Sequence, residues 1–185
     1  ALRAPTPEGA KRRRLLEEAV QLKNYEFNAH GVELGQHYES SAVVSDGSAK
    51  PTPARDPELY YEPSTHPGVR LPHAWVGDNA RKYSTHDLAP YGQFTLFTGI
   101  TGEDWTTAAH KVSEQLGVTV NTVVIGPAQD VTDLYFDWAK LRGVEEDGAV
   151  LVRPDKHVGW RSDRLPEDPE AALLNTVSAI LNRGA

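Results

Sequence analysis

The sequence predicts an α/β fold with one mixed sheet and flanking helices, preceded by a helix-plus-strand arm that belongs to another domain. Three observations carry this prediction. Residues 94–125 have the order strand, helix, strand. A further helix, two short strands and a last helix follow, an order typical of one mixed sheet. The first 45 residues have too few apolar side chains for a core of their own.

Composition excludes several classes of function. The 185 residues carry 19 Lys and Arg against 26 Asp and Glu, a net charge of −7, which argues against nucleic-acid or anionic-membrane partners. There is no cysteine, so disulfides, thiolate metal sites and cysteine nucleophiles are excluded. No apolar run approaches the roughly 18 residues needed to span a bilayer. We expect a cytoplasmic protein.

The chain begins at Ala1, contains no Met and shows no export signal, so it is either a mature protein or a piece of a longer one. Thr6 can cap a helix with Pro7 at its first position, and the helix should end near Asn24. Residues 41–44 predict a strand. The apolar side chains at helical spacing are Leu15, Leu16, Ala19, Val20 and Leu22.

Residues 48–69 form a proline-rich connector, because five prolines disfavour regular helix there. The domain proper starts at about Arg70. It opens with a hairpin whose strands flank a turn at residues 77–79. A short strand at 94–98 follows, ending at Gly99.

The next elements complete a βαβ unit. An amphipathic helix runs to Leu116 and ends at Gly117, and residues 118–125 are almost continuously β-branched, as in a strand buried on both faces. The apolar positions of that helix are Trp105, Ala108, Ala109, Val112 and Leu116.

A second helix is predicted from Asp130 or Thr132 to Gly143, with Leu134, Tyr135 and Trp138 on one face. Strands at 149–152 and 157–160 come next. The last helix is capped by Asp168, begins at Pro169, and buries a stripe that comprises Leu173, Leu174, Val177, Ile180 and Leu181.

This order is the thioredoxin-like arrangement, but the redox chemistry of that fold is missing. A low-pKa thiolate would have to start the first domain helix, where residues 99–105 contain no sulfur. Gly148 stands where such enzymes place a cis proline before the third core strand. An independent oxidoreductase is therefore excluded.

Other chemistries find little support. His30 and His37, like His66 and His73, are seven residues apart, but in extended stretches this spacing predicts no metal site, and H-E-x-x-H is absent. No serine-nucleophile or phosphate-loop motif occurs. The Gly99-x-x-Gly102 turn is more simply a strand-to-helix connection than an anion site.

A cluster of polar and aromatic residues occupies the predicted hairpin from Arg153 to Arg161. The favoured interpretation is a tight turn, in which Arg153 and Asp155 exchange hydrogen bonds and Trp160 completes a small core. The alternative is a contact surface, because Trp and Arg are enriched in interface hot spots.

Five segments of the chain, taken together and in order, point to a known family. They are residues 23–35 (KNYEFNAHGVELG), 67–75 (PGVRLPHAW), 84–88 (STHDL), 94–99 (FTLFTG) and 148–161 (GAVLVRPDKHVGWR). These segments resemble the C-terminal part of FAD-dependent phenolic hydroxylases of the 2,4-dichlorophenol 6-monooxygenase type.

The resemblance implies a division into three parts. Residues 1–47 would be the C-terminal end of the FAD-binding domain, with its helix and exit strand; 48–69 the connector; and 70–185 a thioredoxin-like domain without redox cysteines. The parent enzyme would hydroxylate phenols with FAD, NAD(P)H and O2. None of the matching segments is a motif to which the family assigns chemistry, so no catalytic, cofactor-binding or metal residue is expected in this chain.

Two functions remain open at this stage. The leading hypothesis is an accessory or interaction part of a flavin-dependent monooxygenase, inactive alone, which contacts its own FAD domain and allows homo-oligomers. The alternative is a free-standing, non-catalytic thioredoxin-like binding module. The arm at residues 6–45 favours the first, because its apolar side chains need a partner that the chain does not supply.

Overall fold

The structure, a computed structural model, describes residues 2–78 and 80–183. The chain divides into two compact units, which we describe separately. The helical unit comprises Ala1–Gln36 and Thr52–Glu62, and the sheet unit comprises His37–Pro51 and Pro63–Ala185. The domain boundaries predicted after residues 47 and 69 concern a longer protein and stay a prediction.

The helical unit consists of α1 (Pro7–Phe27), α2 (His30–Leu34) and an irregular segment. The predicted cap is confirmed: the Thr6 side chain accepts a hydrogen bond of 3.2 Å from the backbone N–H of Gly9. The helix extends three residues beyond the predicted end, to Phe27. The irregular segment is tied to the helices by a 2.6 Å hydrogen bond from the Tyr25 hydroxyl to Asp56. No helix among the described residues is long and apolar enough to cross a membrane.

The strand predicted at residues 41–44 is wrong. These residues turn, with a 3.0 Å hydrogen bond from the backbone N–H of Val43 to the Ser40 carbonyl. The physical reason is that a strand needs a ladder of backbone partners. Here the Ala42 carbonyl bonds to the Arg153 side chain, and the Val44 N–H bonds to the Gly159 carbonyl.

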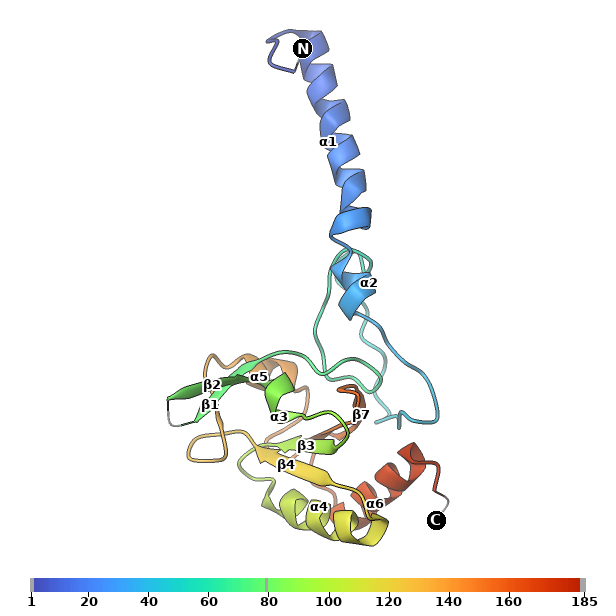
Figure 1. Cartoon of the computed structure of the whole chain (residues 1–185), viewed down its shortest axis with the longest axis vertical. Coiled ribbons are helices and arrows are strands. Elements are labelled where there is room, and N and C mark those ends of the chain that lie inside the picture. Colours follow the sequence, from blue (N-terminus) through green and yellow to red (C-terminus); the bar gives the residue numbers. More distant parts are fainter. Residues whose placement is uncertain (1, 79, 184–185) are drawn as a thin grey trace. The chain divides into compact units, whose positions relative to one another are not determined.

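The sheet unit contains two sheets (Figure 1). The four-stranded sheet has the order β4-β3-β6-β7; its β3 and β4 are parallel, and its other neighbours are antiparallel. The three-stranded sheet is antiparallel, with the order β2-β1-β5. The strands are β1 (Trp75–Asp78), β2 (Arg81–Ser84), β3 (Phe94–Thr98), β4 (Val120–Val124), β5 (Thr132–Asp133), β6 (Ala149–Val152) and β7 (Val158–Ser162). The helices are α3 (Thr85–Leu88), α4 (Glu103–Leu116), α5 (Asp137–Leu141) and α6 (Pro169–Ile180).

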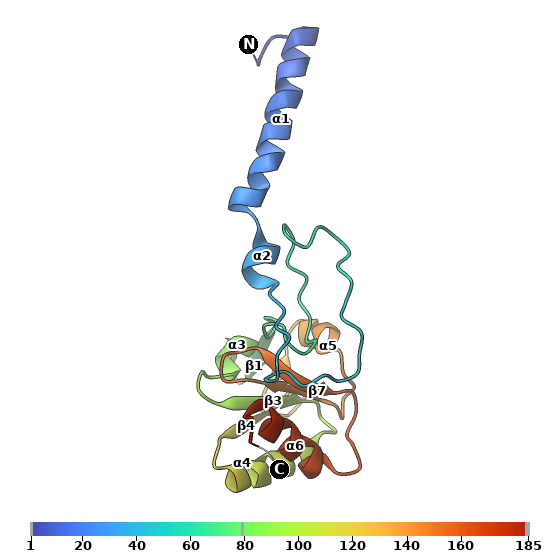
Figure 2. The ribbon, with the colours of Figure 1, turned by 90° about the vertical axis from the view of Figure 1, so that its right-hand side faces the viewer.

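The four-stranded sheet separates two hydrophobic cores, because successive side chains of a strand point to opposite faces. In β3, Leu96 belongs to the core beneath α4 and α6, whereas Phe97 belongs to the core shared with the hairpin and α5. Figure 2 shows α4 and α6 together on one side of this sheet. The sheet unit is thus a mixed α/β domain with helices on one face and a smaller sheet on the other.

Most elements of the sheet unit were predictable. The strands β3 and β6 have the predicted bounds. The helix α4 ends at Gly117, whose left-handed φ of 64° suits glycine. The Asp168 carboxylate caps α6 through a 2.9 Å hydrogen bond from the Ala171 N–H. The hairpin β1–β2 is also confirmed, although Gly77 and Asp78 lie within its first strand, and Asn79 is outside the described residues.

The long helix predicted up to Gly143 is wrong over its first half. Residues 132–133 form β5, which pairs with β1, and only Asp137–Leu141 are helical. The Asp130 carboxylate accepts from the Val124 N–H at 2.9 Å, so it does not cap a helix. The side chains expected on one face separate accordingly: Trp138 is buried, while Leu134 and Tyr135 are exposed.

Candidate functional site

A segment of the sheet unit without regular structure, residues 37–48, lies along the edge of the fold, and we call it the strap. Its backbone is bonded at two points: the Tyr38 N–H donates to the Gly68 carbonyl at 2.9 Å, and the Val44 N–H donates to the Gly159 carbonyl at 2.8 Å. At Gly68, with a φ of +97°, an added Cβ would collide with the Tyr38 carbonyl. Glycine is therefore required for the strap to approach this closely.

Two arginines from the hairpin predicted at residues 153–161 hold the strap. Arg153 donates 3.0 Å and 2.6 Å hydrogen bonds to the Ala42 carbonyl and to Asp155. Arg161 pairs with Asp46 and donates a 3.0 Å hydrogen bond to Ser48. The predicted turn bond between Arg153 and Asp155 is confirmed. These arginines also contact the chain's own strap, which the sequence did not indicate.

The Asp46–Arg161 pair is mostly shielded, with 9% and 14% of the two side chains exposed. Burial by itself opposes ionisation of Asp46, but hydrogen bonds from Ser48 and Arg161 outweigh it and lower the pKa of Asp46. A charged Asp46 is therefore the form that fixes the strap.

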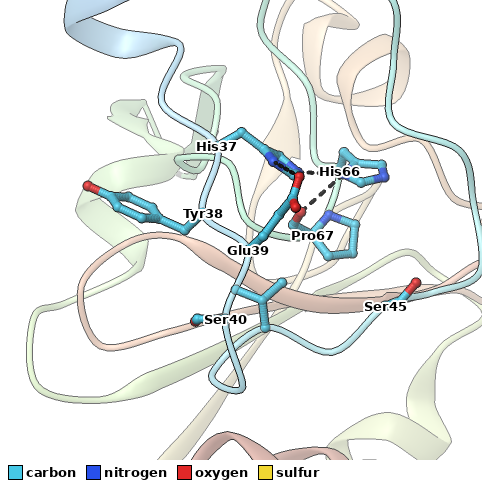
Figure 3. A pocket seen from close by; sticks show the side chains of 8 residues that line it. His37, Tyr38, Glu39, Ser40, Ser45, His66 and Pro67 are labelled. Carbon is cyan, nitrogen blue, oxygen red and sulfur yellow. Dashed lines mark hydrogen bonds and ion pairs between the residues drawn. The ribbon is translucent and has the colours of Figure 1, made fainter.

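A cavity of about 250 Å³ lies where the strap meets residues 66–67 (Figure 3). The rings of His37 and His66 face each other there, with 3.3 Å between His37 Nε2 and His66 Nδ1. His66 Nδ1 also lies 3.0 Å from the Pro67 carbonyl, which can only accept. The carboxylate of Glu39 is 3.5 Å from His37 Nδ1.

The surroundings of His37 oppose its protonation. Burial, followed by the nearby Lys50 and His66, lowers the pKa of His37. Because the Pro67 carbonyl needs a donor, we assign a proton to His66 Nδ1. The pocket can thus hold a hydrogen-bonded imidazole pair, and among the described residues no three His, Cys, Asp or Glu side chains gather as metal ligands.

The histidines that contact each other in the structure are not the pairs seven residues apart that the sequence analysis considered. His37 meets His66, 29 residues away. His73 instead contacts Ser84 at 2.8 Å and the Trp75 ring, with 4.6 Å between centroids. His30 lies in the helical unit. A contact across 29 residues of irregular chain leaves no periodic signal that could have revealed it.

The strand-to-helix turn before α4 is filled by protein groups. The Glu146 side chain lies against Gly99, and its pKa is lowered by its hydrogen bond to Arg142 and, less, by a bond from the Ile100 backbone. Trp105, at the start of α4, is fully buried and donates to the Asp147 carbonyl at 2.9 Å. A carboxylate at this turn makes it a poor phosphate cradle, since phosphate binding uses free N–H groups.

The sequence profile of the family described as "Aromatic-ring hydroxylase, C-terminal" matches residues 64–183. The chain belongs to this family. The matched residues lie within the sheet unit, and the resemblance to phenolic hydroxylases stated from five sequence segments is confirmed.

Relatives of this aromatic-ring hydroxylase domain are larger proteins. This chain is 55% identical over 173 residues to a phenol 2-monooxygenase of Pseudomonas sp. (strain EST1001), and the match covers 94% of this chain and 28% of that protein. It is 47% identical over 182 residues to a 2,4-dichlorophenol 6-monooxygenase of Cupriavidus pinatubonensis, covering 97% of this chain and 30% of that protein.

A solved structure agrees with these relatives. The flavin-dependent monooxygenase PieE, in complex with FAD and substrate, superposes with a TM-score of 0.89 at 43% identity, covering 99% of this chain and 31% of PieE. The chain therefore spans about three-tenths of the length of the proteins it matches.

Proposed function

We propose that the chain is the C-terminal accessory part of a flavin-dependent monooxygenase that hydroxylates phenols with FAD, NAD(P)H and O2. The observation that carries this proposal is the match of almost the whole chain to under a third of a phenol 2-monooxygenase, at 55% identity. We also propose that this enzyme is cytoplasmic.

The helical unit supports a role in contact with a further domain. In α1 only Gly9 is buried, and an apolar row along the helix is exposed. Residues 1–47 would then belong to the FAD-binding domain, which would cover this row. The exposed apolar side chains are Leu15, Leu16, Val20, Leu22 and Phe27.

We also propose that residues 70–185 form a thioredoxin-like domain, with residues 48–69 as its connector. The strand order β4-β3-β6-β7, with a parallel βαβ half and an antiparallel ββα half, supports this kinship. The turn before α4 contains no sulfur, and Glu146 lies against it, so a domain of this kind would serve contacts and not redox exchange.

The turn before α4 does not fit the pyrophosphate of FAD. The turn before α4 begins a helix after a parallel strand, and there Glu146 presents a carboxylate, which would repel a pyrophosphate. The side chain of Thr98 also lies against Gly102, at the start of that helix, and donates to the Gly148 carbonyl at 2.7 Å. The flavin would therefore bind the remainder of the parent enzyme.

The test compares this chain with a polypeptide extended upstream through its own reading frame. Flavin absorbance is measured after gel filtration, together with phenol-stimulated NAD(P)H consumption. We expect about one FAD per extended polypeptide, phenol-dependent oxidation, and neither property for this chain alone.

Two outcomes would contradict the proposal. Stoichiometric FAD on this chain would show that these residues hold a flavin site of their own. An extended polypeptide without flavin would favour the alternative, a free-standing thioredoxin-like binding module.

A further inference from the structure

An exposed apolar patch lies where the parallel strands β3 and β4 end, and it consists of Ile100, Leu134, Tyr135 and Phe136. Ile100 follows β3, and the other three residues lie between β5 and α5. Ile100 and Phe136 line one cavity of about 200 Å³, so these two segments meet there. Exposed apolar side chains that gather in one place mark interaction sites, whereas scattered ones do not.

The cavity at the centre of this patch is apolar. Ile125 and Trp138, which are buried, line it together with Ile100 and Phe136. An apolar cavity of about 150 Å³ holds a benzene ring, so this cavity has room for one large apolar side chain. The patch therefore offers a partner an apolar rim around a hollow, the arrangement that receives buried anchor residues in protein interfaces.

Phe136 combines an exposed ring with a strained backbone. Its φ of 56° lies in the left-handed region, which bulky side chains rarely adopt, and 71% of the residue is exposed. It caps no helix through its side chain, since Asp133 accepts the 2.9 Å hydrogen bond from the Ala139 N–H of α5. Strained residues cluster at functional surfaces. A partner that covers the ring would offset a cost that nothing around Phe136 offsets in this chain.

Tyr91 provides a contrast within the same unit. It is 72% exposed, as much as Phe136, but the Lys156 ammonium lies 4.4 Å from the centroid of its ring. A cation over an aromatic face is a favourable arrangement at an exposed site. Tyr91 does not line the cavity, so it is a matched control for the patch.

The size of the patch favours a partner on the same polypeptide over a second copy of this chain. A stable interface between separate proteins buries about 800 Å² on each side, from roughly 20–30 residues, whereas this patch has four large side chains. A covalently attached partner has a high effective concentration, so a smaller contact suffices. The likeness to PieE covers 99% of this chain but 31% of PieE, so a parent protein of that length supplies such a partner.

We propose that this patch docks onto the part of the parent polypeptide that precedes this chain. The surface that it meets would be apolar, with one large side chain seated in the cavity and with the Phe136 ring buried at the centre of the contact. The inference rests on the proposed function, which supplies the upstream part. It adds to the contact of α1 a second contact, made by the sheet unit.

Hydroxyl-radical footprinting, resolved by residue with mass spectrometry, tests this docking on this chain and on the upstream-extended polypeptide. The oxidation rates of Tyr135 and Phe136 should fall about fivefold or more in the extended polypeptide, because the core of an interface excludes solvent. Tyr91, outside the patch, is the internal control, and its rate should change by less than about twofold.

A pair of variants locates the contact. Phe136→Asn removes the ring but places there a residue that tolerates the left-handed backbone, so the chain should stay folded. In the extended polypeptide this variant should raise the oxidation rate of Tyr135 about twofold or more, because aromatic anchors carry much of the energy of an interface. Tyr91→Asn should leave that rate unchanged. If Phe136→Asn does not fold, as judged by circular dichroism, the rates in the unaltered proteins still decide.

Equal oxidation of Tyr135 and Phe136 in this chain and in the extended polypeptide would overturn the proposal. Protection that grows with protein concentration would also overturn it, because the occupant would then be a second copy. A flavin-loaded, phenol-oxidising extended polypeptide with an unprotected patch would remove this inference and leave the proposed function. A flavin-free extended polypeptide with a protected patch would remove the proposed function and leave the docking.

Discussion

The helices α1 and α4 both carry apolar side chains at helical spacing, but they use them differently. The row on α4 is buried, with Trp105 fully enclosed, whereas Leu22 on α1 is 73% exposed. The difference shows that periodicity specifies a helical face and not what covers it. Since most helical stability in proteins comes from packing, α1 should depend on a partner that α4 already has.

The largest expected effect comes from removing the indole ring of Trp105, at the start of α4. Trp105→Ala should lower the free energy of unfolding of the sheet unit by about 3–5 kcal/mol, because it empties a fully buried site beneath α6. Leu22→Ala, on α1, should change it by less than about 0.5 kcal/mol. Chemical denaturation followed by near-UV circular dichroism measures both. Similar losses of stability in the two variants would contradict the claim that the apolar side chains are packed in α4 and exposed in α1.

The strap offers a second test. It has no regular secondary structure, and the ion pair between Asp46 and Arg161 holds it. Asp46→Asn should cost about 1–3 kcal/mol at pH 7, because Arg161 then loses its charged partner. Ser45→Ala, on the same strap, is the control and should cost less than about 0.5 kcal/mol. A harmless Asp46→Asn would mean that the strap is held by its backbone bonds alone.

The same pair predicts a dependence on pH. The pKa of Asp46 is lowered in the folded protein, so its stabilising contribution is present above the unfolded-state pKa of about 3.9 and is lost as the pH falls through the folded pKa. The stability gap between the unaltered protein and Asp46→Asn should therefore shrink on acidification. A gap that stays constant down to pH 2 would contradict this assignment.

His86 should make the sheet unit less stable in mild acid. Burial, followed by the charges of Arg70, Lys156 and His73, lowers its pKa to about 4, and only Asp87 acts in the other direction. The unfolded chain takes up this proton near pH 6.5 and the folded chain only near pH 4, so stability falls as the pH is lowered between these values.

His86→Gln should reduce the loss of stability on acidification by roughly 1–2 kcal/mol. This value already allows for the partial solvent exposure of His86. Denaturation midpoints at pH 7 and pH 4.5 measure it. The exposed residue His110, changed to Gln, serves as the control. If His86→Gln loses as much stability between pH 7 and pH 4.5 as the unaltered protein does, His86 takes up its proton as easily in the folded chain as in the unfolded chain.

The smallest effect is expected at the surface where α4 meets α6. Lys111 and Glu170 form a 2.6 Å ion pair with both side chains largely exposed. Lys111→Ala should therefore change the free energy of unfolding by no more than about 0.5 kcal/mol, and added salt should reduce even that. A loss above 1 kcal/mol would show that the pair, and not the apolar row, joins the two helices.

Elements with start or stop signals in their own sequence were predictable. The start of α6 is marked by Asp168 and Pro169, and α4 is marked by its apolar row and by Gly117 at its end. The elements that failed depended on partners elsewhere. Residues 41–44 have strand-like side chains but meet Arg153, and residues 132–133 leave a helical pattern to pair with β1. Tertiary contacts overrode local preference in both places.

The candidate sites were less predictable than the fold. The His37–His66 contact joins segments 29 residues apart, and such an arrangement has no spacing rule in the sequence. The family resemblance supplied the leading hypothesis of function, which no motif within the chain would have given.

The comparison between α1 and α4 is tested most directly by amide hydrogen exchange on this chain and on the upstream-extended polypeptide, both in dilute solution. In this chain we expect fast exchange in α1 and slow exchange in α4, and in the extended polypeptide comparable protection of both helices. A matched extended variant, Leu16→Ser with Val20→Ser, should lose the protection of α1 alone. Equal protection of α1 and α4 in this chain, independent of concentration, would contradict the claim that α1 needs a partner domain.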